Sequence, residues 1–239
     1  MTQLLYLGDS YLKEIDTSVI SVDATGMRIV LDKTIFYPEG GGQPSDHGTL
    51  MKGSEVYRVK MVKKSSEGVA HEVDKTGLKV GDNAHLILDW NRRYILMRYH
   101  TAAHLLSAVI YGKTRVETTG NQLDVDKSRM DFCLEDASKE RIEKFIQQAN
   151  ELILNDAPVK TFVLSKEDAK KDPSLFKLAV KDYIERLKEV RVVDIEGIDK
   201  QADGGTHVHS LKEVGKISLL KIDNKGRNNR RIYFTLGER

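Results

Sequence analysis

Residues 89–112, DWNRRYILMRYHTAAHLLSAVIYG, separate two parts of the chain that follow different patterns. Apolar residues recur here at helical spacing, Asp89 is a suitable N-cap, and the pattern ends near Gly112. The residues before it form short apolar runs, such as RIVLD, VYRVKMV and AHLILD, bounded by glycine, aspartate, asparagine or serine. Such closely spaced strands predict a small antiparallel β-barrel over residues 1–89. We therefore expect a second domain over residues 90–239.

The second domain combines helix and strand patterns. After the opening helix, we expect a helix from Ser138 to about Asn155, whereas EDAKKDPSLFKLAVKD (167–182) predicts a loop with short helical pieces. The expected strands lie at 129–134, 159–164, 190–195, 216–224 and 230–238, the last two joined by a turn over 225–229. Helices packed on a mostly antiparallel sheet make this domain, and the chain as a whole, α+β.

The composition indicates an ordinary folded protein without a strong charge bias. Lysine plus arginine number 38 and aspartate plus glutamate 36, so any nucleic-acid binding must come from a local patch. The single cysteine, Cys133, excludes an internal disulfide, and we expect it to be a small buried core side chain. Neither a signal-peptide pattern nor an apolar run of roughly 18 residues is present, so we expect a cytoplasmic protein without a membrane partner.

Two pairs of polar residues share a spacing of four. His100 and His104 lie on the predicted helix, and Asp203 and His207 flank the glycines of DGGTH. Residues four apart on a helix point to one side, and the glycines allow a turn tight enough to aim both side chains at one point. Either histidine of the helix could be a hydrogen-bonded core residue. Both pairs together favour a shared metal, and three imidazoles with one carboxylate suit zinc.

A glycine run lies within FYPEGGGQPSDHG, residues 36–48. It is either a flexible hairpin connection, which the flanking prolines fit, or a place where the backbone approaches a ligand closely. In the second case Gln43 or Glu39 would present a polar group beside the ligand. No GK[ST] follows the run, so a nucleotide-binding P-loop is not expected.

Two basic stretches are candidates for binding RNA. One lies on the predicted helix, interleaved with tyrosines, and the other lies in NKGRNNRR; their cations are Arg92, Arg93 and Arg98, and Lys225, Arg227, Arg230 and Arg231. Each stretch is either a solvated surface or, near a metal centre, a rim that holds phosphates. Cations together with tyrosine suit a single-stranded RNA end, where bases stack and phosphates need neutralising.

Four motifs, FYPEGGGQPSDHG, HTAAH, DGGTHV and GRNNRR, occur in the same order as in the editing domain of alanyl-tRNA synthetase. The chain resembles in particular the AlaX family of free-standing editing proteins, in the longer form that keeps an N-terminal barrel. The resemblance covers nearly the whole chain, and the superfamily also includes the editing domain of threonyl-tRNA synthetase. Because the chain starts at methionine and runs through the last basic motif, we expect a free-standing protein rather than one domain of a synthetase.

The resemblance implies an aminoacyl-tRNA deacylase that hydrolyses the ester of Ser-tRNA(Ala), and possibly of Gly-tRNA(Ala), in trans. It implies Zn²⁺ bound by the two pairs of residues spaced by four, an aminoacyl pocket beside Gly41, Gly42 and Gln43, and the acceptor end of tRNA(Ala) as partner. A metal-associated water is the expected nucleophile, and no side-chain base is assigned. Thr118 and Thr119, in a loop expected after the helix, are either contacts for the serine hydroxyl or ordinary loop residues.

One metal ligand departs from the family pattern, in which the third ligand is the cysteine of CGGTH. This chain has Asp203 there, and a hard oxygen donor is less selective for zinc over manganese or iron. Two alternatives remain. The enzyme could act on another mischarged tRNA, such as Ser-tRNA(Thr), or the chain could be a non-catalytic RNA-binding module in which a closed four-ligand shell holds a structural metal.

Overall fold

The computed structural model describes residues 1–176, 189–226 and 229–237. The chain forms two compact units, Met1–Ile95 and Leu96–Arg239. The division falls inside the first long helix, α1 (Trp90–Thr114), rather than in front of it. Of the described helices, none is both long enough and apolar enough to cross a membrane.

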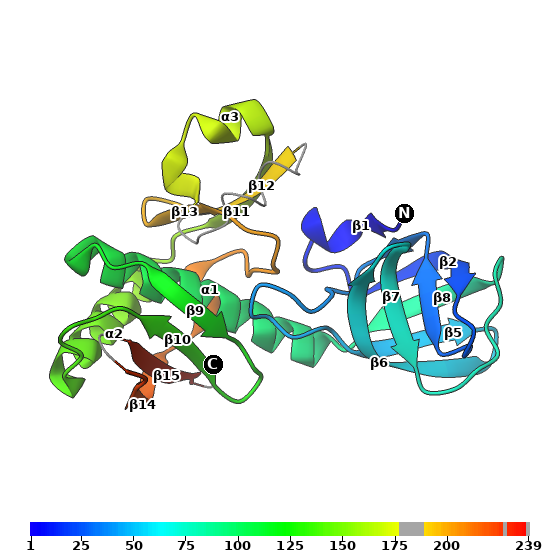
Figure 1. Ribbon diagram of the computed structural model, residues 1–239, viewed down its shortest axis with the longest axis horizontal. Coiled ribbons are helices and arrows are strands. Elements are labelled where there is room, and N and C mark those ends of the chain that lie inside the picture. Colours follow the sequence, from blue (N-terminus) through cyan, green and yellow to red (C-terminus); the bar gives the residue numbers. More distant parts are fainter. Residues whose placement is uncertain (177–188, 227–228, 238–239) are drawn as a thin grey trace. The chain divides into compact units, whose positions relative to one another are not determined.

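The first unit is a closed antiparallel barrel, as predicted (Figure 1). Its strands, in order around the barrel, are β2 (Glu14–Val22), β3 (Arg28–Leu31), β7 (Gly68–Val73), β6 (Glu55–Ser65), β5 (Gly48–Lys52) and β8 (Asn83–Leu88). Alternate residues of these strands are buried, which fills the interior with side chains such as Leu50, Tyr57 and Leu86. Outside the barrel, β1 (Gln3–Leu4) pairs in parallel with β4 (Lys33–Thr34), and the 3₁₀ turn η1 (Leu5–Leu7) follows β1.

The first turn of α1 belongs to this unit and carries a fully buried cation. Both the Arg93 and the Asp46 side chains are 0% exposed, and they form an ion pair through the Arg93 guanidinium. The same guanidinium donates to the carbonyl oxygens of Ser10, at 2.8 Å, and Ile35, at 2.6 Å. The prediction that Arg93 belongs to a tRNA-binding rim is therefore wrong, because its side chain is fully buried and its guanidinium donates to groups inside the protein.

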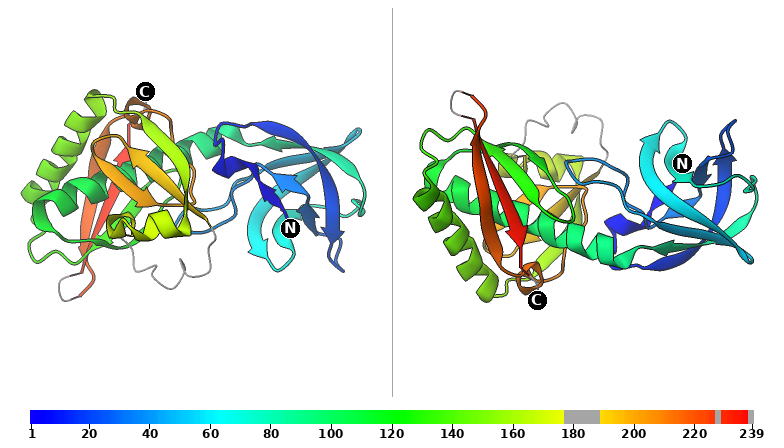
Figure 2. Two further views of the ribbon diagram at one scale, coloured as in Figure 1. Left: turned by 90° about the horizontal axis from the view of Figure 1, so that it is seen from above. Right: turned by 90° about the horizontal axis from the view of Figure 1, so that it is seen from below.

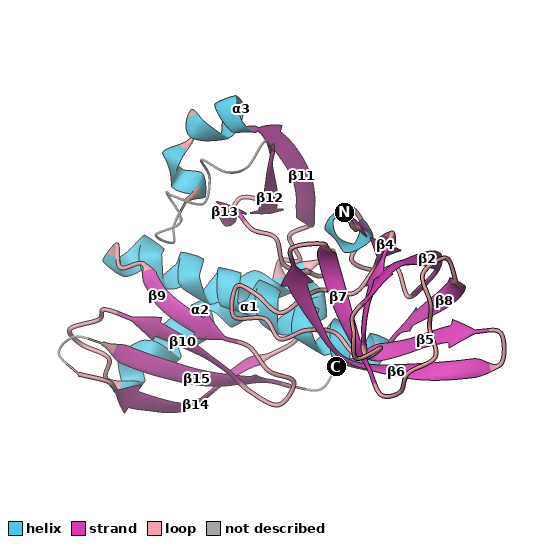
Figure 3. Ribbon diagram, turned by 45° about the vertical axis from the view of Figure 1, so that its right-hand side comes forward, coloured by secondary structure: helices cyan, strands magenta, loops and turns pink. Residues whose placement is uncertain are grey.

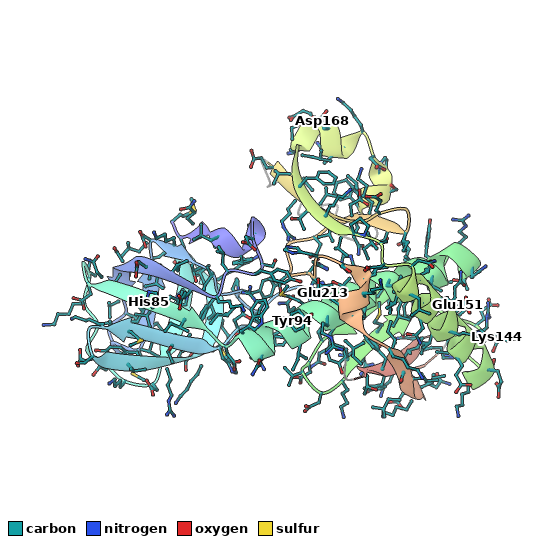
Figure 4. The ribbon with its side chains drawn as sticks, turned by 180° about the vertical axis from the view of Figure 1, so that it is seen from behind. His85, Tyr94, Lys144, Glu151, Asp168 and Glu213 are labelled. Carbon is teal, nitrogen blue, oxygen red and sulfur yellow. The ribbon has the colours of Figure 1, made fainter. Side chains whose placement is uncertain are left out.

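The second unit contains a four-stranded antiparallel sheet covered on one face by two helices (Figure 3). The strand order is β14 (Ile217–Asn224), β15 (Arg230–Leu236), β10 (Ser128–Phe132) and β9 (Thr118–Gln122). Side chains of α1, α2 (Lys139–Leu154), β10 and β15 meet in one apolar layer that includes Leu106, Phe132, Phe145 and Phe234. The opposite face of α2 is exposed and carries Lys144 and Glu151 (Figure 4).

A smaller antiparallel sheet completes the second unit (Figure 2). Its order is β11 (Val159–Ser165), β12 (Glu189–Ile195) and β13 (Asp199–Ala202), and it is followed by the 3₁₀ turn η3 (Leu211–Val214). Between β11 and β12 lie α3 (Lys166–Lys170) and the 3₁₀ turn η2 (Pro173–Leu175). These match the short helical pieces predicted within 167–182; residues 177–182 lie outside the described part of the chain.

Cys133 is exposed, so the prediction of a buried core cysteine is wrong. It directly follows β10, and its neighbours Phe132 and Leu134 are both buried. Because alternate residues of an extended chain face opposite sides, burial of these two turns the thiol outward.

Candidate metal centre

Two parts of the second unit bring the predicted ligands together. His100 and His104 lie one turn apart on α1, and Asp203 and His207 lie in the segment between β13 and η3. Figure 1 shows this segment, in orange, passing beside α1. One nitrogen of each histidine and one carboxylate oxygen of Asp203 all lie within 4.8 Å of one another. All three imidazoles are buried.

The three imidazoles present the same nitrogen to the shared carboxylate. The Nε2 atoms of His100 and His104 lie 3.6 Å and 4.0 Å from Asp203 Oδ1, and His207 Nε2 lies 3.2 Å from Asp203 Oδ2. Four donor atoms that converge in this way match the ligand number of a tetrahedral site. The residues present therefore fit a single divalent ion.

The glycine turn has a steric reason as well as a conformational one. Gly205 has no Cβ, and a Cβ at this position would lie 2.1 Å from His100 Cε1 and 2.3 Å from His100 Nδ1. Its backbone N–H donates to Asp203 Oδ2 at 2.5 Å, which orients the carboxylate. The backbone of Asp203 is in turn held by Arg191, whose guanidinium donates to the Asp203 carbonyl at 2.9 Å. Neighbouring strand and helix residues thus fix the position of this turn.

The electrostatics of the cluster favour neutral imidazoles and an ionised carboxylate. Burial lowers the pKa of His100 to about 4 and that of His207 well below its usual value. Burial opposes ionisation of Asp203, but the surrounding imidazoles hold its pKa well below the ordinary value. A metal requires deprotonated nitrogen ligands, and two of the histidines already have pKa values that supply them at neutral pH.

Two kinds of contact behind the imidazoles were not predicted. Thr101 lies on α1 between the two helix histidines, and its hydroxyl lies 3.1 Å from His207 Nδ1. Asp199 and Gln201, on β13, both approach His104 Nδ1. A signal for the second pair exists in the sequence, because positions 199 and 201 alternate along β13 and so face the same side.

The glycine run forms a tight turn in the barrel unit. Gly40 and Gln43 exchange backbone hydrogen bonds of 3.1 Å and 2.9 Å, and Gly41 and Gly42 have φ angles of 59° and 83°. Positive φ at both central residues is the conformation of a two-residue hairpin turn that strongly prefers glycine. Gln43 is 1% exposed. The role of these residues in binding an aminoacyl group stays a prediction.

Thr118 and Thr119 belong to a strand, not to the predicted loop. They open β9, where Thr118 pairs with Phe132 of β10, and the register shifts between Asp131 and Phe132. The Thr118 hydroxyl lies 2.8 Å from that of Ser107 on α1, whereas Thr119 is exposed. Their contact with a serine substrate stays a prediction.

The described cations of the two basic stretches contact the protein itself. Arg98 donates to the carbonyl oxygens of Val214 and Gly237, and Arg231 forms an ion pair with Asp131. The remaining cations contact carbonyl oxygens or carboxylates nearby: Arg92 to Ser45, Lys225 to Asp223, and Arg230 to Gly226. Arg227 lies outside the described residues. Apart from Arg93, a tRNA-binding role for these residues stays a prediction.

Two family models match separate parts of the chain. Residues 190–233, which include Asp203 and His207, match the threonyl and alanyl tRNA synthetase second additional domain. Residues 9–92 match the model for class II (A) tRNA synthetases.

Several curated relatives match nearly the whole chain. The alanyl-tRNA editing protein AlaX-M of Methanosarcina barkeri is 41% identical, with 99% of each chain covered. The alanyl-tRNA editing protein AlaX-L of Pyrococcus horikoshii is 37% identical over 100% of this chain and 59% of its own length. The alanine–tRNA ligase of Methanococcus aeolicus is 34% identical over 99% of this chain and 26% of its own length.

Proposed function

The chain belongs to the AlaX family of alanyl-tRNA editing proteins, and from this membership we propose that it hydrolyses the ester of mischarged Ser-tRNA(Ala) in trans. We extend the proposal to Gly-tRNA(Ala). A site that selects alanine by size discriminates weakly against a small analogue, so a second, hydrolytic site is the general remedy. The observation that carries the proposal is the convergence of His100, His104, His207 and Asp203 in one buried cluster.

The proposed cofactor is one divalent ion, Zn²⁺ in the first place, held by three neutral imidazole nitrogens and the Asp203 carboxylate. When bound, such an ion supplies Lewis-acid activation of a water or orients the ester. The Gly205 N–H holds Asp203 Oδ2, which leaves Oδ1 on the side of His100 and His104. These contacts hold the four side chains close together before a metal binds, so metal binding should cost little additional side-chain entropy.

The proposed reaction is a simple ester hydrolysis. The oxygen of water adds to the carbonyl carbon of the amino acid, the bond from that carbon to the ribose oxygen breaks, and the ribose oxygen takes up a proton. The products are free serine and tRNA(Ala) with an intact 3′ end. We assign no side chain as the base, and the acceptor end of tRNA(Ala) is the proposed partner.

The test is release of labelled serine from Ser-tRNA(Ala) by the purified, metal-loaded protein. Ala-tRNA(Ala), Gly-tRNA(Ala) and Ser-tRNA(Thr) are run beside it, together with a chelator-treated sample. We expect chelator-sensitive hydrolysis of the serine and glycine esters on tRNA(Ala), with Ala-tRNA(Ala) left intact. Hydrolysis confined to Ser-tRNA(Thr) would replace the proposed substrate. No hydrolysis of any ester by protein that retains its metal would favour the non-catalytic RNA-binding module.

A further inference from the structure

A buried carboxylate lies behind His104, on the side of the ring away from the cluster. Asp199 Oδ2 lies 3.4 Å from His104 Nδ1, and the Asp199 side chain is 1% exposed. The other ring nitrogen, Nε2, faces Asp203 Oδ1 at 4.0 Å. The imidazole of His104 therefore lies between two carboxylates, one beside each nitrogen.

We propose that Asp199 is a positioning residue for the metal centre, which accepts a hydrogen bond from His104 Nδ1–H and so leaves the lone pair of Nε2 directed at the metal. A neutral imidazole carries one proton, and the partner of one nitrogen decides what the other can do. An ionised carboxylate only accepts, so the nitrogen that faces it is the one that keeps the proton. The inference rests on the metal centre of the proposed function.

The position of Asp199 is fixed by the backbone. It opens β13 and pairs with Ile195 of β12, and the connection between them is closed by a 2.8 Å hydrogen bond from Ile198 N to the Ile195 carbonyl. The 3.4 Å separation from His104 Nδ1 is slightly longer than an ordinary hydrogen bond.

Gln201 competes for the same nitrogen, because its side-chain amide Nε2 lies 2.5 Å from His104 Nδ1. A half-turn of an amide exchanges its nitrogen and oxygen, so Gln201 can serve as donor or acceptor. Asp199 has no such choice, and a buried carboxylate is costly unless donors surround it. The carboxylate therefore sets the tautomer of His104, and the amide adapts to it. A charge-assisted hydrogen bond is also stronger than a neutral one.

The test compares three variants of the full chain. Asp199→Leu removes the acceptor at similar volume, Asp199→Asn keeps an acceptor oxygen without the charge, and Gln201→Leu is the matched control on the same face of β13. Zinc affinity is measured by competition with a chromophoric chelator. The protonated nitrogen of His104 is identified by ¹⁵N NMR of the imidazole. His71, which is buried in the barrel against Thr34, serves as the internal reference for the NMR measurement.

We expect Asp199→Leu to lower zinc affinity about 10- to 100-fold and to reduce the population of the Nδ1–H tautomer of His104 while the His71 signals stay unchanged. Asp199→Asn should restore part of both losses, and Gln201→Leu should stay within about 3-fold of the wild type. Should Asp199→Leu fail to fold, the Asp199→Asn result decides: an unchanged affinity and tautomer would overturn the proposal. A large loss in Gln201→Leu with none in Asp199→Leu would also overturn it, since Gln201 would then be the acceptor.

These outcomes separate the inference from the proposed function. A wild type that binds zinc and hydrolyses Ser-tRNA(Ala), beside an Asp199→Leu variant with the same affinity and tautomer, would sink the inference alone. A wild-type protein that binds no divalent ion would overturn the proposal of a metal centre, and with it the inference about Asp199.

Discussion

Gly205 lies against the ring of His100 so closely that a methyl group at position 205 would meet His100 Cε1 at 2.1 Å. Because His100 is held by α1, Gly205→Ala must displace either the imidazole or the turn that carries Asp203. We expect zinc affinity to fall about 10-fold or more, which is the typical loss when residues that orient metal ligands are changed. Gly204→Ala is the matched control, because no atom lies within 4 Å of a Cβ added there. Equal affinities of the two variants would contradict the steric role.

Loss of a histidine should separate activity from folding. His104→Ala is expected to abolish hydrolysis with little loss of fold, whereas Asp203→Ala weakens metal retention because it removes the anionic ligand. Hydrolysis, metal content by mass spectrometry and far-UV circular dichroism are measured on the same samples. The assignment of the site would not survive unchanged activity and metal content in both variants.

Replacement of Asp203 by the cysteine of the family pattern should change metal selectivity. Thiolate is softer than carboxylate, so Asp203→Cys should favour Zn²⁺ over Mn²⁺ more strongly than the wild type. It should also make activity sensitive to peroxide, because a thiolate can be oxidised and a carboxylate cannot. Competition between the two metals at fixed protein concentration measures the first effect, and activity after peroxide treatment the second. The exposed Cys133 of the wild type controls for oxidation elsewhere.

Removing only one partner of the buried ion pair between Arg93 and Asp46 should lower the free energy of unfolding more than replacing both partners with apolar residues. Arg93→Met leaves a carboxylate buried without its cation, which destabilises a protein by about 3–5 kcal/mol. The double variant Arg93→Met/Asp46→Leu should recover a large part of this loss. Urea unfolding measures both, with Arg92→Ala as the neighbouring control. A double variant less stable than Arg93→Met would contradict this account.

His71 should make the barrel less stable in acid. Burial lowers its pKa from 6.5 to about 4, so between these values the unfolded chain binds a proton that the folded barrel does not. Stability is therefore complete above pH 6.5 and falls as the pH drops towards 4, by roughly 3 kcal/mol in all. His71→Gln should flatten this part of the stability profile measured by urea unfolding.

The control for the pH effect is His85→Gln on the same barrel (Figure 4). Asp16 raises the pKa of His85, so the stability that this histidine contributes is complete below pH 6.5 and is lost as the pH rises above that value. His85→Gln should therefore leave the slope between pH 6.5 and 4 unchanged. If His71→Gln has the same pH dependence of stability as the wild type, the acid sensitivity must come from other groups.

The members of the candidate metal cluster could be predicted because the signal is local. A helix places His100 beside His104, and a glycine turn places Asp203 beside His207, so only the meeting of the two pairs required the fold. The barrel was predictable for a similar reason, since alternation and turn residues recur along each strand.

The environment of Arg93 could not be predicted, because nothing in the local pattern distinguishes it from Arg92. Its carboxylate partner, Asp46, lies 47 residues earlier, within a glycine- and proline-rich stretch. Thr118 and Thr119 also gave no strand signal, since TTGNQ lacks apolar alternation. That segment becomes a strand because β10 supplies its hydrogen-bond partners.

The helix α1 starts at Trp90, and its residues up to Ile95 belong to the barrel unit. A fragment cut at Leu88, where the last barrel strand ends, would retain Asp46 but lose the guanidinium that covers it. The Asp46 carboxylate would then lack its counterion. We therefore expect a barrel fragment that extends to Ile95 to be more stable than one that ends at Leu88, because only the longer fragment keeps the partner of Asp46.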